Sequence, residues 1–197
     1  MEQRHAAYSV VDNKGSIAEY FQISEGLGFH GFLRDRLGTI TVIDAPGASS
    51  TYITAMNNGR AMTGVYFFPG DLSNTHGFVR APDGSITTFD PPNAISTTSQ
   101  SINFQGQIAG YFTDAGGVRH GFARDTDGTI TQLYAPGATG TVPAAIGADG
   151  KIAGTAFSET SAAPFRLNEH GWKKRSWSAA ISASRDTPRH RRAVLHR

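Results

Sequence analysis

The 197-residue sequence predicts an all-β protein. Short phrases recur every 44 to 47 residues along the chain. Each repeat reads as four short strands rich in Val, Ile, Thr, Tyr and Phe, separated by turns of Gly, Pro and Asp. No window has the i, i+3, i+4, i+7 spacing of apolar residues that a long helix requires. Four strands in a repeat of this length are typical of a blade, so we expect a four-bladed β-propeller.

Three phrases define the repeat. The first begins with His-Gly-Phe, at His30, His76 and His120. The second is Asp-Ala-Pro-Gly-Ala or a variant of it, starting at Asp44, Asp90 and Tyr134. The third is a turn glycine followed by a small-residue apolar strand, at Gly15, Gly59, Gly106 and Gly150. These glycines predict units that start near residues 15, 59, 106 and 150 of a single propeller domain over 1–177.

The unit from Gly106 to Asp149 shows the expected strands most clearly. We expect them at 107–113, 118–124, 129–135 and 141–147. Gly116-Gly117 and Asp127-Gly128 supply the positive φ angles of tight hairpin turns. Pro136-Gly137 ends the third strand, because proline cannot donate a hydrogen bond to a neighbouring strand.

The last unit predicts how the ring closes. Strands are expected at 150–157, 163–167 and 172–177, and no fourth strand follows them. The N-terminus supplies a lone strand at 8–11, which we expect to pair with the last blade and close a monomeric ring without open edges. The alternative is an open or oligomer-completed propeller fragment. We place the strand after each Gly turn nearest the axis, with Glu19 among Gly64, Gly110 and Gly154.

The recurring phrases resemble a bacterial repeat family related to the extracellular HAF repeat. They read H-G-F-x-R-D, D-G-T-I-T, D-A-P-G-A-x-x-T and N-x-x-G-Q-I-A-G-Y-F, and they cover residues 8–172. The resemblance implies a repeat protein with an extracellular location, and it carries over no catalytic residues.

Composition excludes several classes of protein. The chain has no cysteine, which removes disulfides and thiolate chemistry. No apolar run approaches the roughly 20 residues of a membrane span and no apolar leader follows the N-terminus, so a soluble protein is expected. Residues 173–197 hold eight basic residues and one acidic one, whereas the rest has a net charge of −5. We therefore expect a disordered basic tail at 178–197 and no nucleic-acid partner.

Two classes of function stay open. The first is a binding module for a small molecule, a glycan or a protein, with Tyr20, Tyr66 and Tyr111 as candidate stacking residues. The second is a small hydrolase, either a glycosidase, which needs paired carboxylates, or a lactone or ester hydrolase. Glu19 is the catalytic candidate because it breaks the repeat pattern, with Asp114 as its companion. Glu25, Asp71 and Glu159 are further companions on the connections between first and second strands.

The recurring histidines also have two interpretations. His30, His76 and His120 could converge as metal ligands, with a divalent cation in the axial channel. A residue that recurs once in each blade more commonly makes a hydrogen bond to a neighbouring turn. We therefore favour a structural role for these histidines over a metal site.

Overall fold

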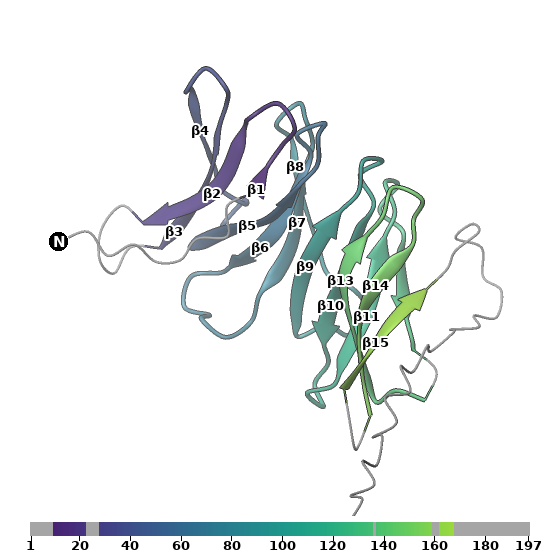
Figure 1. Ribbon diagram of the computed structural model, residues 1–197. Coiled ribbons are helices and arrows are strands. Elements are labelled where there is room, and N and C mark those ends of the chain that lie inside the picture. The colour runs from purple at the N-terminus through teal and green to yellow at the C-terminus, as the bar shows by residue number, and fades with distance from the viewer. Residues whose placement is uncertain (1–9, 23–27, 136, 159–161, 168–197) are drawn as a thin grey trace, which may run out of the picture.

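A computed structural model describes residues 10–22, 28–135, 137–158 and 162–167. Every regular element in these ranges is a β-strand, which confirms the all-β prediction. The strands form four antiparallel sheets, which lie side by side in chain order (Figure 1).

Each of the first three sheets has four strands, and each follows the chain from one edge to the other. The first consists of β1 (Val10–Val11), β2 (Ile17–Gln22), β3 (Phe29–Arg34) and β4 (Ile40–Ile43). The second consists of β5 (Ser50–Met56), β6 (Met62–Phe67), β7 (His76–Arg80) and β8 (Ile86–Phe89). The third consists of β9 (Ser96–Ile102), β10 (Ile108–Thr113), β11 (Arg119–Arg124) and β12 (Ile130–Leu133). In the fourth, the described strands are β13 (Gly140–Ile146), β14 (Ile152–Phe157) and β15 (Ala162–Leu167).

The boundaries between sheets differ from the predicted units by one strand. The strand before each Gly turn pairs with the strand after it, as β9 does with β10. A tight turn joins these two strands, in which the N–H of Asn103 donates to the carbonyl of Gln107. Strand 141–147, predicted to complete the third unit, therefore begins the fourth sheet as β13. The segments that contain the Asp-Ala-Pro-Gly-Ala phrase or its variants carry the chain from one sheet to the next.

The predicted closure by the N-terminal strand is wrong for the residues described. β1 pairs with β2 of its own sheet, with Val10 opposite Ala18 and Val11 opposite Ile17. A short hairpin turn forces this pairing, because the strands on its two sides must lie next to each other. The first and last sheets stand at opposite ends of the row in Figure 1. The strand expected at 172–177 and the tail at 178–197 lie outside the described residues.

The inner edge of the row is formed by the first strand of each sheet. β5 contacts β1 and β9, and β9 in turn contacts β13. The strands predicted to be axial, β2, β6, β10 and β14, are instead the second strands and have a neighbour on each side. Glu19 on β2 is therefore not at the axis, which corrects the predicted position of this carboxylate.

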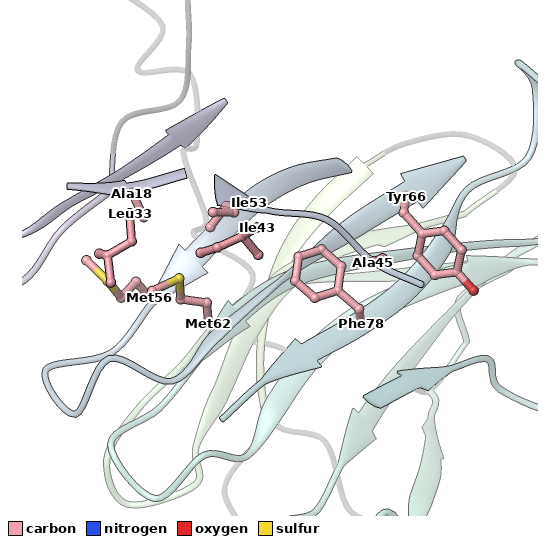
Figure 2. Close-up of a cluster of buried hydrophobic side chains, with 9 residues drawn as sticks. All are labelled: Ala18, Leu33, Ile43, Ala45, Ile53, Met56, Met62, Tyr66 and Phe78. Atoms are coloured by element: carbon pink, nitrogen blue, oxygen red, sulfur yellow. The ribbon is translucent and has the colours of Figure 1, made fainter. Parts of the chain in front are cut away.

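Apolar side chains between neighbouring sheets form the core. We call the side of a sheet that packs on the preceding sheet its leading face, and the other side its trailing face. Figure 2 shows the first contact, where Met62 and Phe78 on the leading face of the second sheet meet Leu33 and Ile43 on the trailing face of the first. Two further clusters join the second sheet to the third and the third to the fourth.

Asparagine side chains tie the turns of adjacent sheets together. The Nδ2 of Asn57 donates to the carbonyl of Asn103 (2.9 Å), and the Nδ2 of Asn103 donates to the carbonyl of Gly147 (3.1 Å). The first sheet has Asp12 at this position, and a carboxylate cannot donate such a bond. Arg60 compensates, with its Nε 3.7 Å from the Asp12 Oδ2, although its φ of 64° lies in the region that favours glycine.

Candidate functional site

The recurring histidines are each held by a carboxylate and an aromatic ring of their own sheet. The Nδ1 of His30 lies 3.0 Å from Asp44 Oδ1, and the Nδ1 of His76 lies 2.8 Å from Asp90 Oδ2. Their rings pack beside aromatic side chains of the adjacent strand, as do the rings of Tyr66 and His76 at 5.4 Å. In the first two sheets this is a repeated structural contact with the connector that follows the fourth strand, β4 or β8.

The third sheet keeps the histidine but changes its partner. Tyr134 stands where the other sheets have Asp44 and Asp90, so His120 cannot pair with the connector. Its Nε2 lies 2.7 Å from Asp114 Oδ2 in the preceding turn. Within the ranges that the structure describes, no three His, Asp or Glu side chains gather as metal ligands. The three histidines are therefore not brought together.

Asp114 serves its own turn rather than facing another carboxylate. Its Oδ1 accepts hydrogen bonds from the N–H groups of Gly116 (2.9 Å) and Val118 (3.0 Å). The hydrogen bond from His120 and then that from the Val118 N–H hold the pKa of Asp114 below its ordinary value. Glu19 lies on the leading face of the first sheet, so the two predicted catalytic carboxylates belong to sheets that are not neighbours.

Turn carboxylates make stability depend on acidic pH. Hydrogen bonds in the turns lower the pKa values of Asp71, Asp127 and Asp114 below the ordinary 3.8. The unfolded chain therefore takes up protons first, so this stabilisation is complete above about pH 4 and is lost as pH falls through the folded-state values. We expect Tm to fall by roughly 5 °C or more between pH 5 and pH 2.5. Thermal melts followed by circular dichroism would measure this.

The variant Asp114→Asn is the control for that prediction. An amide oxygen keeps an acceptor in the turn but does not titrate. The fall in Tm on acidification should be smaller in the variant than in the parent chain. An identical pH profile in both proteins would show that Asp114 contributes nothing to the acid sensitivity.

The three candidate tyrosines occupy different environments. Tyr66 is buried between Phe68 and His76, so it belongs to the core and cannot stack on a ligand. Tyr20 is half-buried against Phe29 and Tyr52, with ring centroids 5.7 and 4.7 Å away.

Tyr111 occupies the position in the third sheet that Tyr20 occupies in the first. It is half-buried, and the guanidinium of Arg119 lies 5.4 Å from its ring centroid. Tyr111 therefore combines an accessible ring with a cation.

Arg119 borders a hollow between the third and fourth sheets. The hollow measures about 430 Å³ and is lined by Gly117, Val118, Arg119, Thr139, Gly140 and Phe157. At the corresponding place between the first two sheets, the rings of Phe29 and Tyr52 pack 5.2 Å apart and fill the space. Arg119 stands in place of Phe29, and Val142 stands in place of Tyr52.

A second difference opens the same place. The hydroxyl of Ser50 accepts a hydrogen bond from the N–H of Phe29 (3.1 Å), and Ser96 does the same for Thr75 (3.2 Å). Gly140 is the corresponding residue of the fourth sheet, so this side-chain contact cannot form there. Arg119 and Gly140 were missed as candidates from the sequence, although a comparison of the repeats position by position shows both as departures.

Of the remaining candidate carboxylates, the structure describes Asp71 alone. The Asp71 carboxylate accepts hydrogen bonds from Ser73 and Asn74 of its own loop. Glu25 and Glu159 lie outside the described residues. The part of the chain that the structure describes contains no helix that could cross a lipid bilayer.

Comparison with solved structures places the fold among β-propellers. TolB from Acinetobacter baumannii is similar over 81% of this chain and 40% of its own, with a TM-score of 0.60 and 17% identity. Virginiamycin B lyase from Staphylococcus aureus is similar over 85% and 54%, with a TM-score of 0.52 and 17% identity. A streptogramin B lyase covers 81% of this chain and 50% of its own, at 16% identity and a TM-score of 0.50.

These similarities define the class of fold and nothing finer. Identities this low show a shared propeller architecture and do not transfer activity. The chain spans about half the length of the structures it matches. No protein-family model and no curated protein matches the sequence.

Proposed function

We propose that the chain is a ligand-binding β-propeller module that takes a ring-shaped ligand bearing a carboxylate, such as an acidic sugar. The observation that carries this proposal is Arg119, an exposed cation stacked on Tyr111 at the edge of the hollow. Among the described residues, no acidic side chain forms an ion pair with it. Its fork of N–H donors has the geometry to bind a carboxylate at two points.

The lining of the hollow suits a ligand that is both apolar and polar. Phe157 offers a ring, Gly140 exposes backbone, and Thr139 adds a hydroxyl. Pockets that combine apolar walls with a few fixed polar groups bind small molecules with defined orientation. Sugars match this pattern because their rings present C–H faces and hydroxyl edges.

A hydrolase receives less support from the described residues. A glycosidase needs two facing carboxylates, and Glu19 and Asp114 belong to different sheets with the second sheet between them. The resemblance to HAF-type repeats supports an extracellular location as a further part of this proposal.

Isothermal titration calorimetry tests the proposal with hexagalacturonate as the acidic probe and maltohexaose as the neutral one. We expect the chain to bind the acidic probe and to bind the neutral one at least tenfold more weakly. Arg119→Gln should weaken binding of hexagalacturonate by roughly tenfold or more, because a charge-assisted hydrogen bond contributes about 1.5–3 kcal/mol. Tyr111→Ala should weaken it several-fold by removing the stacking surface.

Arg36→Gln is the matched control, because Arg36 is exposed in the turn between β3 and β4, away from the hollow. It should leave the affinity unchanged. Equal affinity for the two probes, or an Arg119→Gln variant that binds as well as the parent, would contradict the proposed site. Release of shorter fragments during the titration would show that the chain is an enzyme.

A further inference from the structure

One wall of the hollow is formed by a short turn and the residue that follows it. Gly117 and Val118 lie in the connection 114–118 between β10 and β11, and Arg119 is the first residue of β11. The equivalent connection of the second sheet, 68–75, is longer. Arg119 pairs with the last residue of β10, directly beside the turn. The placement of its guanidinium therefore depends on how the turn is held.

One oxygen of the Asp114 carboxylate holds the backbone of this turn. Asp114 Oδ1 accepts hydrogen bonds from the N–H groups of Gly116 (2.9 Å) and Val118 (3.0 Å). Asp35 makes the same two kinds of contact in the turn 35–39, at 2.8 and 2.9 Å. A turn of this kind therefore needs only one of the two carboxylate oxygens.

The second oxygen of Asp114 pairs with a histidine. Asp114 Oδ2 lies 2.7 Å from His120 Nε2, and this nitrogen carries the proton because an ionised carboxylate only accepts hydrogen bonds. In the first two sheets the recurring histidine uses Nδ1 instead and reaches the connector, at Asp44 and Asp90. In the sheet that borders the hollow, the histidine therefore binds the turn in place of the connector.

His120 is itself fixed by the core. Its ring stacks on Phe112, with the centroids 5.0 Å apart and an angle of 29° between the planes. Phe112 is buried in the cluster that joins the second sheet to the third. The pair of Asp114 and His120 therefore ties the exposed turn to the packed interior.

This pair lies on the side of the third sheet that faces away from the hollow. Arg119 and His120 are neighbours on β11, so their side chains point to opposite sides of the sheet. Arg119 lines the hollow, whereas His120 lies with Phe112 on the leading face. Asp114 and His120 can therefore act on a ligand in the hollow only through the turn.

We infer that Asp114 and His120 are positioning residues of the ligand site, an inference that rests on the proposed function. They hold the turn 114–118 against the core, so that the guanidinium of Arg119 and the exposed backbone of Gly117 are in place before a ligand arrives. A site that is ordered in advance binds more tightly, because less conformational entropy is lost on binding.

Substitutions of His120 test this role by calorimetric titration with hexagalacturonate at about pH 8, where an ordinary histidine is neutral. His120→Leu keeps a side chain against Phe112 but has no donor, and should weaken binding about fivefold. The Nε2 of His120→Gln can reach Asp114 much as the imidazole Nε2 does, so its affinity should stay within about twofold of the parent's. His120→Asn is too short and should resemble His120→Leu.

Asp114→Ala separates positioning from a simple effect of charge. Removal of a negative charge near the site would by itself strengthen the binding of an acidic ligand, whereas a loosened turn should weaken it about tenfold. His76→Leu is the matched control, because it breaks the equivalent pair with Asp90 in the second sheet, away from the hollow. It should leave the affinity unchanged. Circular dichroism checks that each variant is folded. Tighter binding by Asp114→Ala, or an equal loss in His76→Leu, would overturn the inference.

Two measurements need no ligand. Long-range ¹H–¹⁵N NMR spectra should show the proton of neutral His120 on Nε2, and those of His30 and His76 on Nδ1. The amide proton of Val118 should exchange with solvent faster in His120→Leu than in the parent. A neutral His120 protonated on Nδ1, or an unchanged exchange rate, would contradict the inference.

The titrations also distinguish this inference from the proposed function. If the parent chain bound neither hexagalacturonate nor maltohexaose, both would fall. If the parent bound hexagalacturonate and His120→Leu bound it equally well, the positioning role alone would be overturned.

Discussion

Phe78→Ala is expected to lower the free energy of unfolding by about 3–5 kcal/mol, the usual cost of deleting a fully buried aromatic ring. Phe78 is completely buried in the cluster that joins the first two sheets. In Figure 2 its ring lies beside Ile43 and Ala45, which follow one another closely in the chain. Removal of the ring leaves a cavity between the first and second sheets. Their strands are fixed by backbone hydrogen bonds, so they cannot move together to fill it. Urea denaturation followed by circular dichroism would measure the loss.

Phe32→Ala is the matched control, since Phe32 has the same position in the first sheet but is only half-buried. We expect it to cost less than half as much as Phe78→Ala in the same urea titration, because a half-buried ring loses fewer contacts. Equal losses in the two variants would mean that Phe32 is covered as completely as Phe78 in the isolated chain.

The strands themselves were predictable because their signals are local. The four expected strands of residues 106–149 agree with β10 to β13 to within two residues at each end. Hairpin turns such as the one at Gly128, with a φ of 91°, require a residue that tolerates positive φ, and the sequence shows a glycine there. A chain that repeats the same turn chemistry also repeats the same hairpins.

The grouping of strands into sheets could not be predicted in the same way. Whether β13 pairs with β12 or with β14 depends on the two connections beside it, of which one is a tight turn and the other a Pro-Gly crossover. The curvature of the row is set by the contacts between sheets, which involve residues some 45 positions apart. Sequence periodicity therefore predicts a blade but not how many blades a ring needs.

The candidate site was only partly visible in the sequence. Tyr111 was identified because it is aromatic, but Tyr66 was identified for the same reason and is a core residue. The difference is one of register, because neighbouring residues of a strand face opposite sides. Arg119 becomes informative only beside Phe29 and Thr75, the residues at its position in the other sheets.

Gly64→Ala should be among the most damaging small substitutions in the chain. A Cβ at this position would lie 2.0 Å from the carbonyl oxygen of Tyr52 and 2.7 Å from the Phe78 ring. The first of these atoms is backbone on β5, next to the irregular pairing between Ile53 and Ala55, so the strand itself must move. Overpacking of a core costs about 1–3 kcal/mol and occasionally more, and we expect a loss of about 3 kcal/mol or more here.

Gly70→Ala separates this steric effect from the general cost of replacing glycine. Gly70 has a φ of 84°, and an added Cβ there would meet nothing within 4 Å, so only backbone strain of about 1 kcal/mol is expected. Both free energies of unfolding can be measured by urea titration. If Gly64→Ala lowered the free energy of unfolding no more than Gly70→Ala does, the Phe78 ring and the β5 backbone would be able to move aside for the added methyl group, which would contradict the steric explanation.

The first sheet carries Glu19 at the position equivalent to Gly64. There, Phe32 packs beside Phe21 and is only half-buried. The backbone of β5 and the ring buried over the strand therefore both require the glycine, and the loss from Gly64→Ala should shrink only in part in a Phe78→Ala background.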